Sequence, residues 1–303
     1  MKKHAYLIMA HNNFEQLKTE LRLLDDARND IYIHIDKKAK KVNLNEIKDC
    51  VHSSNVYFTK RYNVKWAGYS GIQCELELLK TAIAKQKYQY YHLLSGMDLP
   101  LKSQDEIHDF FEQNKGKEFI SFDRENVQPY VKERIQYYYF FQNIYGRNRK
   151  NPFLVFLFLI DKISIILQKV IKINRIKNKN IKLQKGANWF SITHSFVEYI
   201  LKKESWIRKT FRYSRSGDEV FLQTILINSD FWSNLYQNGL NGACLRKIDW
   251  GRGKPYIWGK QDYEELMYSN QLFARKFDEN IDNEIIRLIS EKIQSTLERK
   301  TYE

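Results

Sequence analysis

The sequence predicts an α/β protein with a mixed, mostly parallel central sheet flanked by helices. Its beginning gives the clearest signal, because apolar runs at 4–10 and 31–35 enclose a segment, 14–24, whose apolar residues recur at helical spacing. A strand–helix–strand opening is how a parallel sheet begins. The chain has 303 residues, no internal repeat and no linker rich in proline, glycine or serine. We therefore expect one domain over 1–303.

The remaining elements follow from the same patterns, taken in chain order. Short apolar runs predict further strands at 56–58, 88–94, 118–122, 186–191 and 245–250. Helical spacing predicts helices after Ser70, over 194–203 and after Ser216, and a Tyr-rich helical stretch over 130–145. Ser70 is expected to be an N-cap, and Ser103 with Glu106 has the spacing of a capping box.

Charge and composition narrow the class of partner. The formal net charge is +14 and 43% of residues are hydrophobic, so the chain is neither disordered nor an integral membrane protein. Excess positive charge suits a polyanion: nucleic acid, an anionic membrane surface or a phosphate-bearing substrate. Cys50, Cys74 and Cys244 are odd in number and lack metal-ligand spacing, and the first residues run into a strand without a cleavable signal. We expect a reduced, cytoplasmic chain.

The segment 152–185 combines an apolar run with a basic one. Residues 152–160 are uninterrupted apolar sequence, which continues at helical spacing beyond Asp161 and Lys162. The run is too short to span a bilayer, which requires about 20 apolar residues. A cationic tract follows: Lys169, Lys172, Arg175, Lys177, Lys179, Lys182 and Lys185. This pattern is typical of a helix lying in a membrane surface, and a buried helix with a solvated loop is the alternative.

The stretch from Ser214 to Leu226 places two adjacent carboxylates, Asp218 and Glu219, at an expected helix entry. Taken alone, Ser216 and Glu219 have the spacing of a capping box, which is a structural role. Asp218 alone is a favourable charge in a first helical turn. The sequence has no glycine-rich phosphate loop and no dinucleotide fingerprint, so the P-loop and G-x-G-x-x-G classes are excluded.

Six short motifs together carry more information than any one of them. They are 5–11 (AYLIMAH), 33–36 (IHID), 66–70 (WAGYS), 95–100 (SGMDLP), 216–219 (SGDE) and 272–278 (LFARKFD). In this order they resemble the core-2/I-branching β-1,6-N-acetylglucosaminyltransferase family (glycosyltransferase family 14), which also holds the peptide O-xylosyltransferases. Two features depart from that family: Gly217 stands where it has proline, and the disulfide cysteines of its animal members are missing.

The resemblance implies a GT-A-type fold, a UDP-sugar donor, inversion at the anomeric carbon and no metal. By motif position, Glu219 matches the family's catalytic base, which takes the proton of the acceptor hydroxyl. The donor diphosphate is expected at Lys276 and Arg275, together with Arg252 or Lys254. The uridine is expected at Ala10, His11, Asp36 and Trp66. The acceptor is expected at Asp98, Glu133, Arg134 and Trp189.

Transfer of a sugar from a UDP-sugar requires a base for the acceptor hydroxyl and positive charge for the departing diphosphate. One carboxylate within reach of the acceptor hydroxyl is enough to take its proton. The departing diphosphate needs positive charge, and a divalent cation prefers several oxygen ligands. The expected strand end offers Asp98 as its single carboxylate, so fixed cations such as Lys276 would take the place of a metal. Without the resemblance, Lys276 would be a solvated charge at a helix end.

The sequence thus predicts a metal-independent inverting glycosyltransferase that moves a sugar from a UDP-sugar to a saccharide or lipid-linked saccharide acceptor. The first choice for that sugar is GlcNAc, added in β linkage, and the second is xylose. We expect a role in cell-surface polysaccharide synthesis, in the cytoplasm and peripherally on the inner face of the plasma membrane, with no cofactor besides the co-substrate. Two alternatives come from other classes: a basic nucleic-acid-binding protein, and a peripheral membrane scaffold held by 152–185. The basic residues are spread out and no nucleic-acid motif occurs, so we expect no nucleic-acid partner.

Overall fold

A computed structural model describes residues 3–40, 42–123, 129–177, 181–240 and 242–301. Its strands are β1 (His4–Ala10), β2 (Asn29–Ile35), β3 (Asn55–Phe58), β4 (Tyr90–Ser95), β5 (Asp98–Pro100), β6 (Phe119–Ile120), β7 (Phe190–Thr193), β8 (Arg246–Ile248) and β9 (Phe273–Arg275). Its α-helices are α1 (Phe14–Leu24), α2 (Leu44–Lys48), α3 (Ser70–Ile83), α4 (Gln104–Gln113), α5 (Pro129–Gln136), α6 (Gln142–Tyr145), α7 (Pro152–Val170), α8 (His194–Lys202), α9 (Glu204–Phe211), α10 (Phe221–Ile227), α11 (Tyr263–Met267) and α12 (Asn283–Thr301). Short 3-10 turns lie at η1 (Gly217–Glu219), η2 (Asp230–Asn234), η3 (Tyr236–Gly239) and η4 (Lys260–Asp262).

The central sheet has six strands in the order β3-β2-β1-β4-β7-β6. The first four run parallel to one another, and β7 is antiparallel to both of its neighbours. The predicted α/β class with a mostly parallel sheet is therefore confirmed. Ala10 of β1 pairs with Ile35 of β2, and Met9 pairs with Ser95 of β4, so these three strands end together. Ligands of such sheets gather at the carboxyl ends of the strands.

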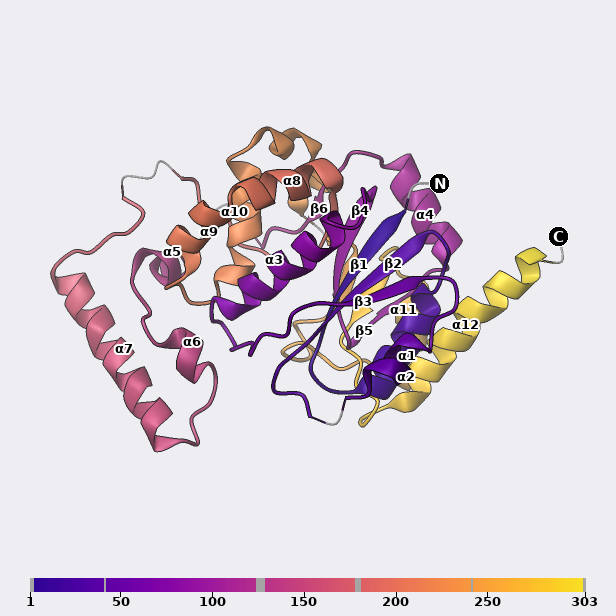
Figure 1. The fold of residues 1–303 in the computed structure, drawn as a ribbon, viewed down its shortest axis with the longest axis horizontal. Helices are drawn as coiled ribbons and strands as arrows, with labels where there is room; N and C mark the ends of the chain where they lie inside the picture. The colour runs from indigo at the N-terminus through magenta and orange to yellow at the C-terminus, as the bar shows by residue number, and fades with distance from the viewer. Residues whose placement is uncertain (1–2, 41, 124–128, 178–180, 241, 302–303) are drawn as a thin grey trace.

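Alternate residues of β1 enter the cores on the two faces of the sheet, as strand geometry requires. Leu7 packs into the core that holds α3, α8 and α10, together with residues such as Ile72 and Phe221. Tyr6 and Ile8 pack into the opposite core, which holds α1. Figure 1 shows these two layers of helices on either side of the strands. Because both faces are covered, every residue of β2 is buried, as in other parallel sheets.

A second, three-stranded sheet has the order β5-β9-β8 and follows the end of β4. In it, Asp98 of β5 pairs with Arg275 of β9 in antiparallel register. Leu99, Ala274 and Phe277 join the apolar residues of α12 in a third core. This small sheet places the 272–278 motif beside the carboxyl end of the central strands.

Several local expectations can be judged directly. The Ser103–Glu106 capping box of α4 is confirmed, with both reciprocal hydrogen bonds present. Ser216 and Glu219 have capping-box spacing but form no capping box: Ser216 has a positive φ of 51° and its side chain makes no cap hydrogen bond. Ser70 is the first residue of α3 and not its N-cap, and its hydroxyl accepts from the Lys65 amide at 2.8 Å. The Tyr-rich stretch divides into α5 and α6.

Helix α7 lies at one end of the molecule, separated from the central sheet by α5 and α6 (Figure 1). The alternative of a buried helix for this segment is wrong, because only Leu157, Asp161 and Gln168 of α7 are buried. The cationic tract is not one surface: Lys169 pairs with Glu133, Arg175 donates to backbone carbonyls, and Lys179 lies outside the described residues. Within the described part of the chain, no helix combines the length and hydropathy needed to cross a bilayer.

Candidate active site

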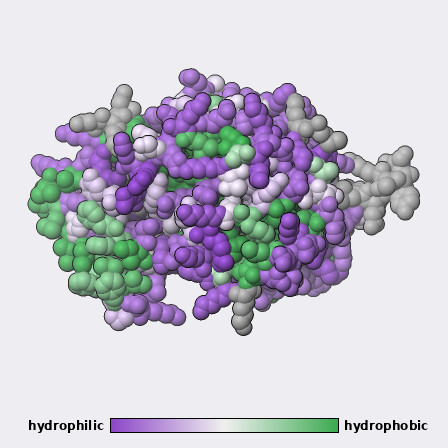
Figure 2. Space-filling view, viewed as in Figure 1, coloured by the Kyte–Doolittle hydropathy of each residue, from purple (hydrophilic) through white to green (hydrophobic). Residues whose placement is uncertain are grey.

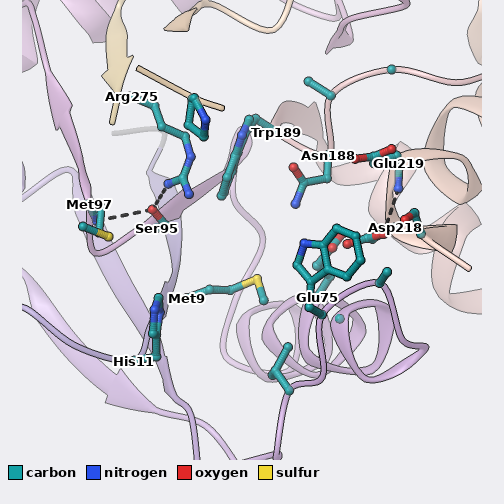
Figure 3. A pocket seen from close by; sticks show the side chains of 18 of the residues that line it. Met9, His11, Glu75, Ser95, Met97, Asn188, Trp189, Asp218, Glu219 and Arg275 are labelled. Carbon is teal, nitrogen blue, oxygen red and sulfur yellow. Dashed lines mark hydrogen bonds between the residues drawn. The ribbon is translucent and has the colours of Figure 1, made fainter. Parts of the chain in front are cut away.

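A cavity of about 680 Å³ opens where β1 and β4 end. Its lining comes from parts of the chain that are distant in sequence: the ends of β1 and β4, the start of α3 with the loop before it, the segment after β6, the loop before β7, the η1 turn, the segment after β8, and β9. Figure 3 shows acidic side chains gathered at one side and Arg275 at the other. The lining includes Ala10, His11, Trp66, Glu75, Ser95, Asp123, Lys185, Asn188, Trp189, Asp218, Glu219 and Arg275.

Glu219 stands at the acidic side, at the end of η1, and its side chain is 40% exposed. Two cations face its carboxylate: Arg134 Nη1 lies 3.2 Å from Oε2, and Lys185 Nζ lies 3.6 Å from the same oxygen. Lys185 is also held by Asp123. The Glu219 carbonyl accepts from the Gly186 amide at 3.0 Å, which fixes the turn against the loop before β7. The carboxylate is thus oriented, and still open to a ligand.

Lys185 was placed by its sequence in the basic tract, and the fold turns it into the cavity instead. Burial alone would lower its pKa, but the hydrogen bond that Lys185 donates to Asp123 and the charge of Glu219 outweigh that effect and raise the pKa. A positively charged Lys185 therefore neighbours Glu219. No local pattern distinguishes Lys185 from Lys182, so the sequence had no signal for this contact.

Two further carboxyl groups lie behind Glu219. Asp218 has its pKa raised to about 6, chiefly by burial and then by the charge of Glu219. Glu75, on α3, is buried and its pKa is raised well above the usual value, again by burial and then by Asp218. Neither oxygen of Glu75 has a hydrogen-bond partner among the described residues. Sequence reasoning missed Glu75, although its position three residues after Ile72, on the apolar face of a predicted helix, could have indicated a buried acid.

Arg275 stands at the opposite side of the cavity. Its guanidinium donates to Asp98 Oδ1 at 2.7 Å and also to the Ser95 hydroxyl. It lies over the ring of Trp189, with Cζ 4.5 Å from the ring centroid. Asp98 itself is fully buried, and it also accepts from the Ser95 amide at 2.9 Å. Asp98 was expected to bind the acceptor, but its burial and these bonds make it the group that holds Arg275 in place.

The other cations expected at the donor diphosphate are placed differently. Lys276 follows Arg275 and is half-buried, and its pKa is lowered by burial and by the neighbouring Arg275 charge. Arg252 is engaged by three carboxylates outside the cavity lining: Asp249, Asp262 and Glu265. Lys254 is exposed and does not line the cavity either. Of the four, the structure brings Arg275 to the cavity and Lys276 next to it.

The residues expected to bind the uridine lie near one another. Ala10, His11 and Trp66 all line the cavity, and Trp66 is 53% exposed. Asp36 is buried just after β2, where it caps the following turn by accepting from the Lys38 amide at 2.8 Å. Burial lowers the pKa of His11; the Asp36 charge opposes this effect and the Lys276 charge adds to it. The charges of Asp36 and Lys276 therefore both act on the His11 imidazole.

The residues expected at the acceptor are only partly brought together. Trp189 lines the cavity, and Arg134 reaches it through its ion pair with Glu219. Glu133 faces the other way: its carboxylate pairs with Lys169 at 2.8 Å and does not line the cavity. Across the part of the chain that the structure describes, no three His, Cys, Asp or Glu side chains gather in a way that could hold a metal ion.

Sequence comparison finds named glycosyltransferases among the proteins similar to this chain. The chain is 24% identical to xylosyltransferase 2 of Rattus norvegicus over 306 residues, which cover 94% of this chain and 33% of that protein. It is 25% identical to a Bos taurus β-1,3-galactosyl-O-glycosyl-glycoprotein β-1,6-N-acetylglucosaminyltransferase, over 96% of this chain and 69% of that protein. Among solved structures, mouse xyloside xylosyltransferase 1 aligns with a TM-score of 0.35 and 9% identity, covering 90% of this chain and 97% of that one.

This chain thus spans about a third of the length of the xylosyltransferases that it matches. The model of the Core-2/I-Branching enzyme family matches residues 4–274, which include the central sheet, the η1 turn and most of β9. With this match, the chain belongs to the Core-2/I-Branching enzyme family, a family of glycosyltransferases.

Proposed function

We propose that this chain transfers a sugar from a UDP-sugar to a saccharide hydroxyl, with inversion at the anomeric carbon and without a metal. The observation that carries the proposal is the division of one cavity into two charged sides, with the Glu219 carboxylate at one and the Arg275 guanidinium at the other. These are the two charges that the reaction requires: a base for the acceptor and a cation for the leaving group.

In the proposed reaction, Glu219 takes the proton of the acceptor hydroxyl as its oxygen attacks the anomeric carbon. The new carbon–oxygen bond forms as the bond from that carbon to the diphosphate breaks, and UDP leaves with the electron pair. Arg134 and Lys185 orient the carboxylate, because both reach the same oxygen, Oε2. The other oxygen is then left for the hydroxyl.

Arg275 and Lys276 neutralise the departing diphosphate in this mechanism. A hydrogen-bonded cation aimed at charge that develops in the transition state typically contributes about 3 kcal/mol. Asp98 supports a metal-free reaction, because its carboxylate already bonds Arg275 and Ser95. Cavity residues at the end of β1 and beside α3 are proposed to hold the uridine: Ala10, His11 and Trp66, with Asp36 behind them.

We propose GlcNAc or xylose as the sugar, since the named relatives transfer one or the other. For the acceptor we propose a saccharide, either free or lipid-linked, in cell-surface polysaccharide synthesis. We place the reaction in the cytoplasm, at the inner face of the plasma membrane. Cys50, Cys74 and Cys244 are all free thiols, which is what a reducing compartment favours.

A panel of UDP-sugars, incubated with EDTA present, tests donor and metal requirement together. We expect UDP release from UDP-GlcNAc or UDP-xylose, stimulated by saccharide acceptors and unchanged by EDTA. Activity that appears only when Mn²⁺ or Mg²⁺ is restored would refute the metal-free mechanism. Absence of turnover with every UDP-sugar, from a chain shown to be folded, would refute the donor class.

A further inference from the structure

Helix α7 is held in one fixed rotation about its own axis. Asp161 accepts from the Phe141 amide at 3.1 Å, and Gln168, two turns later, exchanges two hydrogen bonds with the backbone of Tyr138. These are polar anchors on the inner side of a mostly apolar helix. Because residues seven apart lie on one helix face, the same side of α7 is fixed to the body from Asp161 to Gln168.

The opposite side of α7 is apolar and exposed. The exposed fraction of its side chains ranges from 49% for Leu159 to 71% for Val170. Figure 2 shows the resulting apolar patch at the end of the molecule where α7 lies. We call this patch the α7 face; it consists of Phe153, Phe156, Leu159, Ile163, Ile166, Leu167, Val170 and Ile171. Patches of this kind on a folded protein mark interaction surfaces.

Positive charge surrounds the α7 face. Asp161 is the single acidic residue between positions 147 and 182, and it is buried. At about 100° per residue, Lys162 lies at the border between the anchored side and the α7 face. Exposed cations precede the helix in sequence (Arg147, Arg149 and Lys150), lie within it (Lys162, and Lys169 in its pair with Glu133) and follow it (Lys172 and Lys177).

This charge distribution selects one occupant. A second copy of the chain could cover the apolar residues, but symmetric pairing would place the same cations against one another. A bilayer with anionic headgroups satisfies both features, since it accepts apolar side chains below the headgroup level and attracts lysines at that level. Helix α7 has 19 residues and is bonded to the body along one side, so it would lie in the membrane plane.

We propose that the α7 face docks this chain on an anionic phospholipid surface, with the helix parallel to the bilayer. The proposal rests on the proposed function in one respect, because it assigns the acceptor to a membrane-borne class. The path from the membrane to the site is short: α7 contacts the stretch of chain that leads from α5, and Arg134 of α5 bonds Glu219. A docked α7 therefore holds the catalytic end of the cavity near the headgroups.

Co-sedimentation with vesicles tests the surface on the whole chain. We expect binding to vesicles of phosphatidylcholine mixed with phosphatidylglycerol, much weaker binding to phosphatidylcholine alone, and a loss of affinity as salt rises. The triple variant Phe156→Ser/Ile163→Ser/Ile166→Ser should bind anionic vesicles at least about tenfold more weakly. The pair Lys162→Gln/Lys172→Gln should also lower the affinity, by about tenfold.

Matched controls use exposed apolar residues elsewhere. Tyr268→Ser and Ile281→Ser alter side chains that are 84% and 64% exposed but lie outside α7, and should leave vesicle binding unchanged. The proposal is overturned if the folded wild type does not bind anionic vesicles, or if the triple variant binds them as the wild type does. It is also overturned if analytical ultracentrifugation shows a wild-type dimer that the triple variant converts to a monomer, with no vesicle binding by either.

UDP release with a soluble saccharide acceptor separates this proposal from the proposed function. The triple variant should keep wild-type turnover on that acceptor, because the α7 face does not line the cavity. If the chain binds vesicles but hydrolyses no UDP-sugar, the proposed function is refuted and the docking surface stands. If it turns over UDP-sugar but does not bind vesicles, the docking surface is refuted and the proposed function stands.

Discussion

Arg134 Nη1 lies 3.2 Å from Glu219 Oε2, and this contact joins α5 to the η1 turn across 85 residues of sequence. Lys185 approaches the same oxygen from a third part of the chain. A carboxylate held by two cations on one oxygen presents its other oxygen in a defined direction. This arrangement is what distinguishes Glu219 from Asp218, which is adjacent in sequence but faces Gly71 of α3, whose Cβ position would be 3.4 Å from Asp218 Oδ2.

Substitution Glu219→Gln should abolish transfer and spare donor binding. A positioned general base typically contributes 10²–10⁴-fold, so we expect turnover to fall by roughly that factor. The amide keeps the size of the side chain, so UDP affinity measured by titration calorimetry should stay within about twofold of the wild type. A variant that keeps full transfer would show that another group takes the proton.

Arg275→Gln should slow UDP release by about a hundredfold, which corresponds to the roughly 3 kcal/mol that an aimed cation contributes. Arg252→Gln is the matched control, because that arginine is bonded to Asp249, Asp262 and Glu265 and does not line the cavity. Steady-state kinetics with saturating donor would compare them. Equal loss in both variants would argue against a specific role for Arg275.

Glu118→Gln should flatten the pH dependence of stability. Glu118 is buried just before β6, where it accepts from the amide of Thr193, the last residue of β7, at 2.9 Å, and burial raises its pKa to about 7. Because the folded pKa lies above the unfolded one, the folded chain binds the proton more tightly, and stability is lost as pH rises from about 4.5 to 7. The shift corresponds to at most about 3 kcal/mol.

Urea unfolding of the wild type and of Glu118→Gln at several pH values would measure this difference. The free energy of unfolding of the variant should change less between pH 4.5 and 7 than that of the wild type. The exposed Glu264→Gln removes one carboxylate at the surface and serves as a control. Parallel pH curves for wild type and Glu118→Gln would contradict the prediction.

Glu75→Leu should stabilise the fold. The Glu75 carboxyl is buried and lacks a hydrogen-bond partner among the described residues, and a buried polar group without a partner costs about 1–3 kcal/mol in proteins. Its raised pKa makes the ionised form the less stable one in the fold, so the gain should grow as pH rises. Thermal unfolding at two pH values would show this, and a lower melting temperature in the variant would refute it.

Gly186→Ala should destabilise the chain and distort the cavity. A Cβ at this position would lie 1.7 Å from the Ser121 carbonyl oxygen, which is backbone and cannot move aside without shifting the segment that follows β6. Gly116→Ala is a useful comparison, since no atom lies within 4 Å of its Cβ position, although a positive φ of 84° adds its own strain. Urea unfolding should show the larger loss for Gly186→Ala.

The sheet was predictable because its strands are buried on both faces and therefore form continuous apolar runs, as at 4–10 and 31–35. The cavity was partly predictable, since Ala10, His11 and Trp66 follow or flank such elements. What the sequence could not supply were contacts between distant segments. Asp98 and Arg275 are 177 residues apart, and their bond turns an expected acceptor ligand into a support for a cation.

The local signals that failed did so for physical reasons. Ser216 and Glu219 have capping-box spacing, but Ser216 adopts a left-handed backbone, so its hydroxyl does not cap the turn. Arg252 has the chemistry of a phosphate ligand, yet three nearby carboxylates satisfy it. Helix α7 shows the converse: its apolar run was evident, and only the bonds of Asp161 and Gln168 reveal which side faces outward.

The salt bridge between Arg275 and buried Asp98 fixes a positive charge at the cavity that does not depend on the cell's supply of metal ions. A positive charge that is part of the polypeptide cannot dissociate, be chelated or be exchanged for a competing ion. In the proposed mechanism, the rate would then follow the cell's pool of sugar nucleotide and remain indifferent to manganese or magnesium starvation. Cells deprived of those ions would keep this step running while metal-dependent glycosylation slows.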